Sequence, residues 1–185
     1  MLELFSIGHS NHPVGYFIGL LQRHGITALA DVRSTPYSRR HPQFRRETLS
    51  EGLKAAGIAY VFLGAELGGK RAEGLIEAAR KRVFRSGLER LREGAQRYRV
   101  AFMCAEREPL DCHRTMLVAR HLRAPDVSIR HILANGTVEE HESVERRLVA
   151  AEKTAPPPLM ADAEAWREAV ERAYDARSRS WGRPE

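Results

Sequence analysis

The residue types best suited to chemistry gather in one segment, residues 104–114, which we call the cysteine segment. It contains both cysteines of the chain, with Glu106 and His113 close to them. Cys112 precedes a predicted helix, where the helix macrodipole and the flanking His113 and Arg114 would lower the pKa of its thiol. We therefore expect a nucleophile or a proton carrier here, whereas Cys104, at the end of a predicted strand, is either a substrate contact or a buried apolar side chain.

Other ionisable residues stand where further predicted strands end. His9 ends the first strand, Asp31 ends the second with Arg33 just beyond it, and Glu66 follows the third. Parallel strands linked by helices end at one edge of their sheet, and ligands bind in the crevice outside that edge. We therefore predict that these residues share one site with the cysteine segment.

Roles follow from the residue types, because carboxylates, histidines and thiols carry acid–base and nucleophilic chemistry while arginines bind anions. The residues assigned to catalysis are Glu106, Cys112, His113, His9 and Asp31. The residues assigned to substrate binding are Arg33, Ser34, Tyr37, Arg39, Arg114, Cys104 and Glu66. Two alternatives stay open: His9 could only cap the following helix, and Asp31 could only pair with Arg33 or Arg114.

The loop over residues 33–46 is basic and has no acidic residue. Its arginines alternate with Tyr37, His41 and Phe44. Arginine forks bind phosphate, and aromatic faces stack on bases. The loop is therefore expected to clasp an anionic substrate over the cysteine segment, the alternative being a solvated basic loop without a partner.

We expect no cofactor. Cys104, Cys112 and His113, with a carboxylate or His9, would complete a tetrahedral zinc shell, which is the alternative. Their spacing is not a zinc signature, and the adjacent Cys112 and His113 would need a strained arrangement to share one ion. No metal ligand is therefore assigned.

The elements that must position these residues alternate between strand and helix. This pattern predicts an α/β fold of three layers, with a mostly parallel sheet of about five strands and helices on both faces, Rossmann-like or flavodoxin-like. The predicted strands are Leu2–Gly8, Thr27–Val32, Ile58–Leu63, Val100–Cys104 and Val127–Leu133.

The predicted helices lie between these strands. The first follows Pro13, with Asn11 as its capping side chain, and ends at Gly25. Residues 64–70 are expected to form a loop, and Gly87 and Gly94 to interrupt a helical region that spans residues 75–97. The other predicted helices cover residues 46–56 and 113–122 and begin again at residue 139.

The chain divides into an α/β domain over residues 1–152 and a tail over residues 153–185. The tail is predicted to hold a linker with Pro156–Pro158 and an amphipathic helix around Trp166, Val170 and Tyr174. This helix is expected to pack on the domain or to mediate formation of a homo-oligomer.

The composition of the chain limits the classes of molecule that it is expected to bind. The formal net charge is +6 and the pI is near 9.7, so we expect an anionic small molecule or a nucleic acid. No apolar run is long enough to cross a bilayer, and the first residues do not read as a signal peptide, so no membrane association is expected. Two cysteines within one segment exclude a disulfide scaffold, which favours a reducing cytoplasm.

Several short motifs together resemble the family called domain of unknown function 488. The matching pieces are Ser6-Ile-Gly-His-Ser10, Asp31-Val-Arg33 with Pro36 and Ser38-Arg39, Gln43-Phe44, Leu67-Gly-Gly69, Cys104-Ala-Glu106 with Pro109, and Cys112-His-Arg114. The resemblance covers residues 5–133 and implies no settled reaction, although members are sometimes labelled as related to nucleic acid or DNA repair. A fainter likeness, carried by Ala30-Asp-Val-Arg33 and Val100–Cys104, is to rhodanese-type domains.

These observations lead to one main hypothesis and two alternatives. The main hypothesis is an enzyme that acts on an anionic substrate, a nucleic acid or a nucleotide, at the carboxyl edge of the sheet, as a hydrolase or transferase. The first alternative is a non-catalytic module that binds nucleic acid. The second is a thiol-dependent sulfurtransferase or redox protein.

Overall fold

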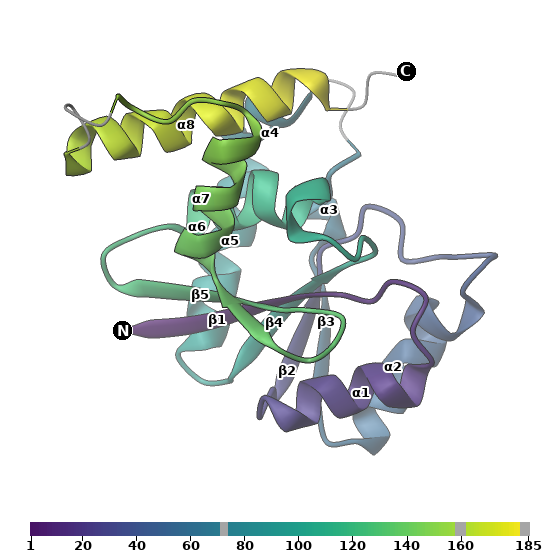
Figure 1. Cartoon of the computed structure of the whole chain (residues 1–185). Coiled ribbons are helices and arrows are strands. Elements are labelled where there is room, and N and C mark those ends of the chain that lie inside the picture. Colours follow the sequence, from purple (N-terminus) through teal and green to yellow (C-terminus); the bar gives the residue numbers. More distant parts are fainter. Residues whose placement is uncertain (71–73, 158–161, 182–185) are drawn as a thin grey trace.

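The computed structural model describes residues 1–70, 74–157 and 162–181. Its centre is a six-stranded sheet in the order β3-β2-β4-β1-β5-β6 (Figure 1). The strands are β1 (Leu2–Gly8), β2 (Ala28–Asp31), β3 (Ala59–Phe62), β4 (Val100–Cys104), β5 (Val127–Ile132) and β6 (Val138–Glu140). The first five pair in parallel, and β6 pairs with β5 in the antiparallel sense.

The predicted fold class is confirmed, with two corrections. The sequence predicted about five strands, and the sixth, β6, lies where residues from 139 onward were expected to be helical. In the strand order, β4 lies between β2 and β1, which differs from both the Rossmann and the flavodoxin arrangement. Local sequence pattern indicated the five parallel strands but not their neighbours in the sheet, because neighbours depend on the path of each crossover helix.

Helices cover both faces of the sheet, which gives three layers (Figure 1). On one face, α1 and α2 bury Phe17, Leu20 and Leu53 against the sheet. The opposite face is covered by α5, α6 and α7, with α8 lying outside them. The helices are α1 (Val14–Arg23), α2 (Arg46–Ala55), α3 (Gly64–Leu67), α4 (Gly74–Arg80), α5 (Arg82–Ala95), α6 (Arg120–Leu122), α7 (His141–Ala151) and α8 (Ala163–Ser180).

Several details of the helix predictions were wrong. Residues 64–70 contain the short helix α3 instead of only a loop. The helical region after it breaks at Lys81, whose backbone is extended, while Gly87 lies inside α5. A Cβ atom at Gly87 would come within 2.8 Å of Leu67, so this glycine lets α3 pack closely on α5. The first helix begins after Pro13 without a side-chain cap, so Asn11 does not cap it.

The segment after the cysteines begins with a wide turn. Residues Arg114–Ala119 form a π-helix, which continues into α6, where a regular helix over 113–122 was expected. Such wide turns are frequent at functional sites. The π-helix is buried throughout, so it anchors the cysteine segment to the core.

The predicted C-terminal helix is present as α8 and packs on the domain. Tyr174 is fully buried in the main core, and Trp166 packs against that core. Pro158, part of the predicted linker, lies outside the described residues. The division of the chain at residue 152 and a homo-oligomer formed through α8 remain predictions. Within the described ranges, every helix is too short or too polar to pass through a lipid bilayer.

Candidate functional site

A cavity of about 350 Å³ opens at the carboxyl edge of the sheet, over three neighbouring strands. Because β4 lies between β2 and β1, the ends of these strands bring His9, Arg33 and Cys104 together. The described residues that line the cavity are His9, Arg33, Ser34, Thr35, Tyr37, Ser38, His41, Gly69, Lys70, Cys104, Ala105, Glu106, His113 and Trp181.

Two thiols, a carboxylate and an imidazole meet at this cavity, which Cys104, Glu106 and His113 line while Cys112 is fully buried. The Sγ atoms of Cys104 and Cys112 lie 2.8 and 3.0 Å from the same Oε2 atom of Glu106. The Nδ1 atom of His113 lies 3.3 Å from Cys104 Sγ. One ligand atom from each of the four residues lies within 4.8 Å of the other three. We call these four residues the thiol cluster.

His113 is held in one orientation by its surroundings. Its Nε2 atom lies 2.9 Å from the carbonyl oxygen of Val32 and donates a hydrogen bond to it. The opposite nitrogen, Nδ1, then carries a lone pair that faces the thiols. A Cβ atom at Gly69 would lie 2.4 Å from His113 Cγ, so only glycine allows the Leu67-Gly-Gly69 segment to pack against this ring.

The two cysteines titrate in opposite directions. Burial raises the pKa of Cys104 well above its usual value, and the adjacent Cys112 and Glu106 raise it further. Burial also opposes ionisation of Cys112, but the thiol of Cys104, the Arg114 guanidinium and His113 together hold its pKa well below the usual value. The negative charge of the pair therefore resides on Cys112, which is fully buried, while Cys104 faces the cavity.

The other two members of the cluster respond to that charge. Burial and the neighbouring Cys112 raise the pKa of Glu106. Burial lowers the pKa of His113, but its contacts with Cys112 and with the Val32 carbonyl outweigh this, so the net shift is upward. Glu106 and His113 therefore hold their protons more tightly than isolated side chains would, whereas Cys112 releases its proton more readily.

Arg114 lies beneath the cysteine segment and does not line the cavity. Its side chain is fully buried and donates to the carbonyl oxygens of Glu106, at 2.5 Å, and Arg107, at 3.1 Å. A Cβ atom at Gly8 would lie 1.9 Å from that Glu106 oxygen. Arg114 and Gly8 thus fix the backbone that carries Glu106, where sequence reasoning assigned Arg114 to the substrate.

Asp31 is buried beneath Arg33 and is not among the residues of the cavity wall. Its carboxylate accepts two hydrogen bonds from the Arg33 guanidinium, at 2.9 and 2.6 Å, and one from the Tyr60 hydroxyl at 2.8 Å. Burial and the neighbouring Asp31 raise the pKa of Tyr60, so that it remains a donor. This geometry matches the alternative in which Asp31 positions Arg33.

His9 lies in the cavity wall and is neutral at physiological pH. Burial and the charge of Arg33 lower its pKa to about 4. Its Nδ1 atom lies 2.8 Å from the Ser10 carbonyl oxygen, and its Nε2 atom accepts from Arg33 Nη1 at 3.2 Å. The ring stacks on Phe44 with 4.2 Å between centroids. His9 therefore holds Arg33 and the basic loop, and it does not cap the next helix.

The basic loop forms the outer wall of the cavity. Tyr37 is exposed, and the Arg45 guanidinium lies 4.6 Å from its ring centroid. Ser34 accepts a hydrogen bond from the backbone N–H of Lys70 at 2.9 Å, which ties the loop to the glycine segment. Arg39 is exposed and does not appear in the described cavity wall.

Sequence reasoning placed Glu66 in the site, and the structure places it elsewhere. Glu66 lies on α3 beyond the outermost strand β3, and it forms an ion pair with Arg90 of α5. Among the described residues that line the cavity, Lys70 and Trp181 were missed, because they lie outside the basic loop, the cysteine segment and the motifs singled out in the sequence. The proximity of Lys70 to the glycine pair hinted at its position, whereas no local signal could show that the end of α8 reaches this cavity.

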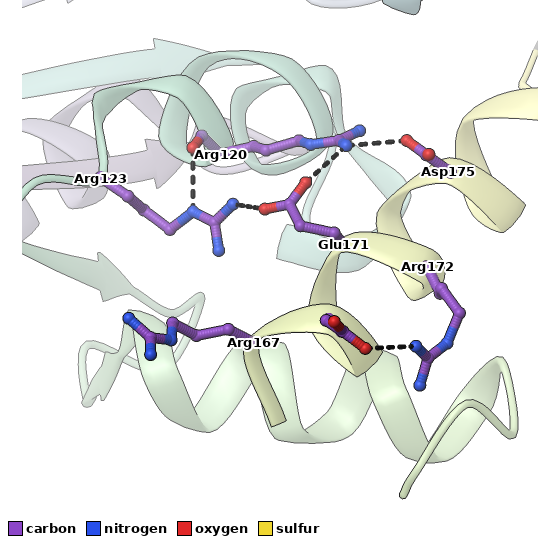
Figure 2. A pocket seen from close by; sticks show the side chains of 7 residues that line it. Arg120, Arg123, Arg167, Glu171, Arg172 and Asp175 are labelled. Carbon is purple, nitrogen blue, oxygen red and sulfur yellow. Dashed lines mark hydrogen bonds and ion pairs between the residues drawn. The ribbon is translucent and has the colours of Figure 1, made fainter. Parts of the chain in front are cut away.

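A second and larger cavity, of about 650 Å³, lies between α6 and α8 (Figure 2). Arg120 donates to Glu171 and Asp175, both at 2.7 Å, and Arg123 also pairs with Glu171. The residues that line this second cavity are Arg120, Arg123, Arg167, Glu168, Glu171, Arg172 and Asp175. Because Figure 2 shows its charged groups joined mainly to each other, this cavity is the weaker candidate for a functional site.

The profile of one protein family matches the chain over residues 13–121. The family is domain of unknown function DUF488. The chain belongs to it. The DUF488 match includes the basic loop, the glycine pair and the thiol cluster, and thereby supports the resemblance found from the motifs. Searches of curated proteins and of solved structures returned no match. The likeness to rhodanese-type domains remains a resemblance only.

Proposed function

We propose that this protein is an enzyme that binds a phosphate-bearing substrate, a nucleotide or a nucleic acid, in the cavity at the carboxyl edge of the sheet. The observation that supports the proposal is that one cavity is lined by two kinds of residue. Arg33 and Lys70 supply positive charge, while Cys104, Glu106 and His113 supply reactive groups. A phosphate held by the first group would present its ester to the second.

Aromatic residues at the rim favour a substrate with a base. Tyr37 is exposed beside Arg45, and Trp181 reaches the same cavity from the end of α8. Aromatic faces stack on nucleobases whatever their sequence. The net charge of +6 adds a general attraction for polyanions.

Binding is tested with a panel of mononucleotides and a fluorescent single-stranded oligonucleotide. Arg33→Gln removes a guanidinium from the cavity. We expect the affinity for nucleotides to fall about ten- to hundredfold, because one or two charge-assisted hydrogen bonds are lost. Arg172→Gln, in the cavity between α6 and α8, is the matched control and should leave affinity unchanged. Equal affinity of the Arg33 variant and the wild type would exclude this site.

Turnover separates the enzyme from the alternative of a non-catalytic nucleic-acid module. The same panel is incubated with the wild type, Glu106→Gln and Glu108→Gln, and the products are separated by chromatography. We expect cleavage or transfer by the wild type and the Glu108 variant, and none by the Glu106 variant. Binding that falls steeply with salt, without turnover of any substrate, would favour the binding module.

The thiol-dependent alternative has less support. A sulfurtransferase needs a thiolate that reaches its substrate, but burial raises the pKa of the cavity-facing Cys104, and the more acidic Cys112 is fully buried. The rate at which iodoacetamide alkylates each cysteine at pH 7 measures how reactive the two thiols are. Slow reaction of both cysteines is expected, and rapid reaction of one would revive a role in sulfur transfer.

A further inference from the structure

The thiol cluster has the composition and geometry of a metal site. Four different donors converge on one point: two sulfurs, one imidazole nitrogen and one carboxylate oxygen, all within 4.8 Å of one another. In tetrahedral zinc sites, metal–ligand bonds of about 2.0–2.3 Å place neighbouring ligand atoms roughly 3.3–3.8 Å apart. The separations of 2.8, 3.0 and 3.3 Å within the cluster approach that range.

We propose that Cys104, Glu106, Cys112 and His113 bind one thiophilic divalent metal ion, zinc. Thiolate and imidazole ligands select zinc over magnesium and calcium, which prefer oxygen. The proposal goes beyond the proposed function and does not depend on it, because a metal ion can be bound whichever substrate enters the cavity.

The imidazole is oriented as a metal ligand. Histidines that bind metals almost always donate their other ring N–H to a carbonyl or a carboxylate, which fixes the tautomer. His113 does so through Nε2, which lies 2.9 Å from the Val32 carbonyl oxygen. Its Nδ1 lone pair is thereby directed at Cys104 Sγ. Gly69 packs closely against the ring, because an added Cβ atom there would lie 2.4 Å from His113 Cγ.

The charges around the cluster balance once a divalent cation is present. Two thiolates and a carboxylate carry three negative charges, and a divalent ion reduces this to one. The buried Arg114 guanidinium, whose hydrogen bonds go to neutral carbonyl groups, supplies the compensating positive charge. The backbone N–H of Arg114 also lies 3.4 Å from Cys112 Sγ, as a donor to a bound thiolate would.

Adjacent ligands do not strain the chain here. Sequence reasoning expected Cys112 and His113 to need a distorted backbone, but Cys112 is extended, with φ −133° and ψ 136°, and His113 is helical, with φ −61° and ψ −20°. The change from extended to helical backbone turns both side chains toward one point. Cys104, Glu106 and His113 also line the cavity, which gives an ion its path of entry.

Metal content of the full chain, purified after expression with added zinc, tests the proposal. We expect about one zinc ion per chain by mass spectrometry of the elements, and less than about a tenth of that in Cys112→Ala and in His113→Gln. Glu108→Gln, on the same segment but outside the cluster, is the matched control and should retain the full content. Substitution by Co²⁺ should give thiolate charge-transfer and tetrahedral d–d absorption in the wild type and in Glu108→Gln, but not in the two cluster variants.

Two controls distinguish loss of the metal site from misfolding of a variant. Circular dichroism selects the variants that fold, and Cys104→Ser and Glu106→Gln serve as substitutes if the more buried positions do not tolerate change. In the wild type, a chelator should raise the rate at which iodoacetamide alkylates Cys104, which lines the cavity, while leaving it below the rate of a free thiol, and zinc should lower it again. Arg33→Gln should keep its zinc while losing anion affinity, which separates this proposal from the proposed function.

Two results would overturn the metal site. The first is wild-type protein that neither contains zinc nor shows a thiolate–cobalt spectrum after reconstitution. The second is folded cluster variants whose zinc content equals that of the wild type.

Discussion

The cavity between α6 and α8 and the cavity at the end of β4 place similar residue types in different surroundings. In the first, Arg120 and Arg123 share Glu171, and Arg120 also binds Asp175. In the second, Arg33 is paired with a buried aspartate, and Arg114 with backbone carbonyls, while the carboxylate of Glu106 is left to the two thiols. In the first cavity the carboxylates pair with arginines and fasten helices together, whereas in the second the Glu106 carboxylate is directed at two thiols, a set of groups that can bind something else.

Removal of the buried cation beneath the thiol cluster should have the largest effect. Arg114→Met deletes the donor for two carbonyl oxygens of the cysteine segment, and buried groups left without partners are costly. We expect a loss of about 3 kcal/mol in the free energy of unfolding, measured with urea. Arg146→Met, which breaks an exposed pair with Glu142, is the control and should cost less than about 0.5 kcal/mol. Similar losses in both variants would contradict the role of Arg114.

The next effect concerns the close approach of Gly69 to His113. Gly69→Ala would place a methyl group within 2.4 Å of the imidazole, so His113 must move and the cluster must loosen. We expect destabilisation of about 1–3 kcal/mol together with loss of bound zinc. Gly19→Ala, a helical position with no heavy atom within 4 Å of the added carbon, should instead stabilise by about 0.5–1 kcal/mol. A Gly69 variant that retains both stability and zinc would show that the contact is easily relieved.

A buried histidine in β5, His131, should make stability depend on pH. Burial, with the charges of His141, Arg114 and Arg147, holds the pKa of His131 well below its usual value of 6.5. Its ring hydrogen-bonds Ser6 Oγ at 2.6 Å and His141 at 2.9 Å.

Below pH 6.5 the unfolded chain therefore binds a proton at His131 that the folded chain does not. The contribution of His131 to the free energy of unfolding is therefore present above pH 6.5. It is lost as the pH falls, by up to about 1.4 kcal/mol per pH unit. Urea titrations between pH 7.5 and about 5.5 should show this decline in the wild type, and a shallower one in His131→Gln. Parallel profiles of the two proteins would exclude His131 as the cause.

The smallest effect is expected in the cavity between α6 and α8. Arg172 pairs with Glu168 at 3.5 Å, and both side chains are more than half exposed. Arg172→Ala should change the free energy of unfolding by less than about 0.5 kcal/mol and leave oligonucleotide affinity unchanged. A large loss of affinity in this variant would reverse the ranking of the two cavities.

The sequence by itself determined which residues reach the carboxyl edge of the sheet. Strand and helix patterns are local, and helical crossovers align the ends of parallel strands. His9, Arg33, Cys104, Glu106 and His113 line one cavity for this reason.

Only the tertiary structure decided which neighbours those side chains meet. Glu66 lies beyond an outer strand and pairs with Arg90, and Arg114 turns inward to backbone carbonyls. Trp181 arrives from a helix distant in sequence. The convergence of the thiol cluster depends on the Val32 carbonyl and on Gly69, contacts that join segments far apart in the chain. Such contacts follow from strand order and packing, which a local pattern does not contain.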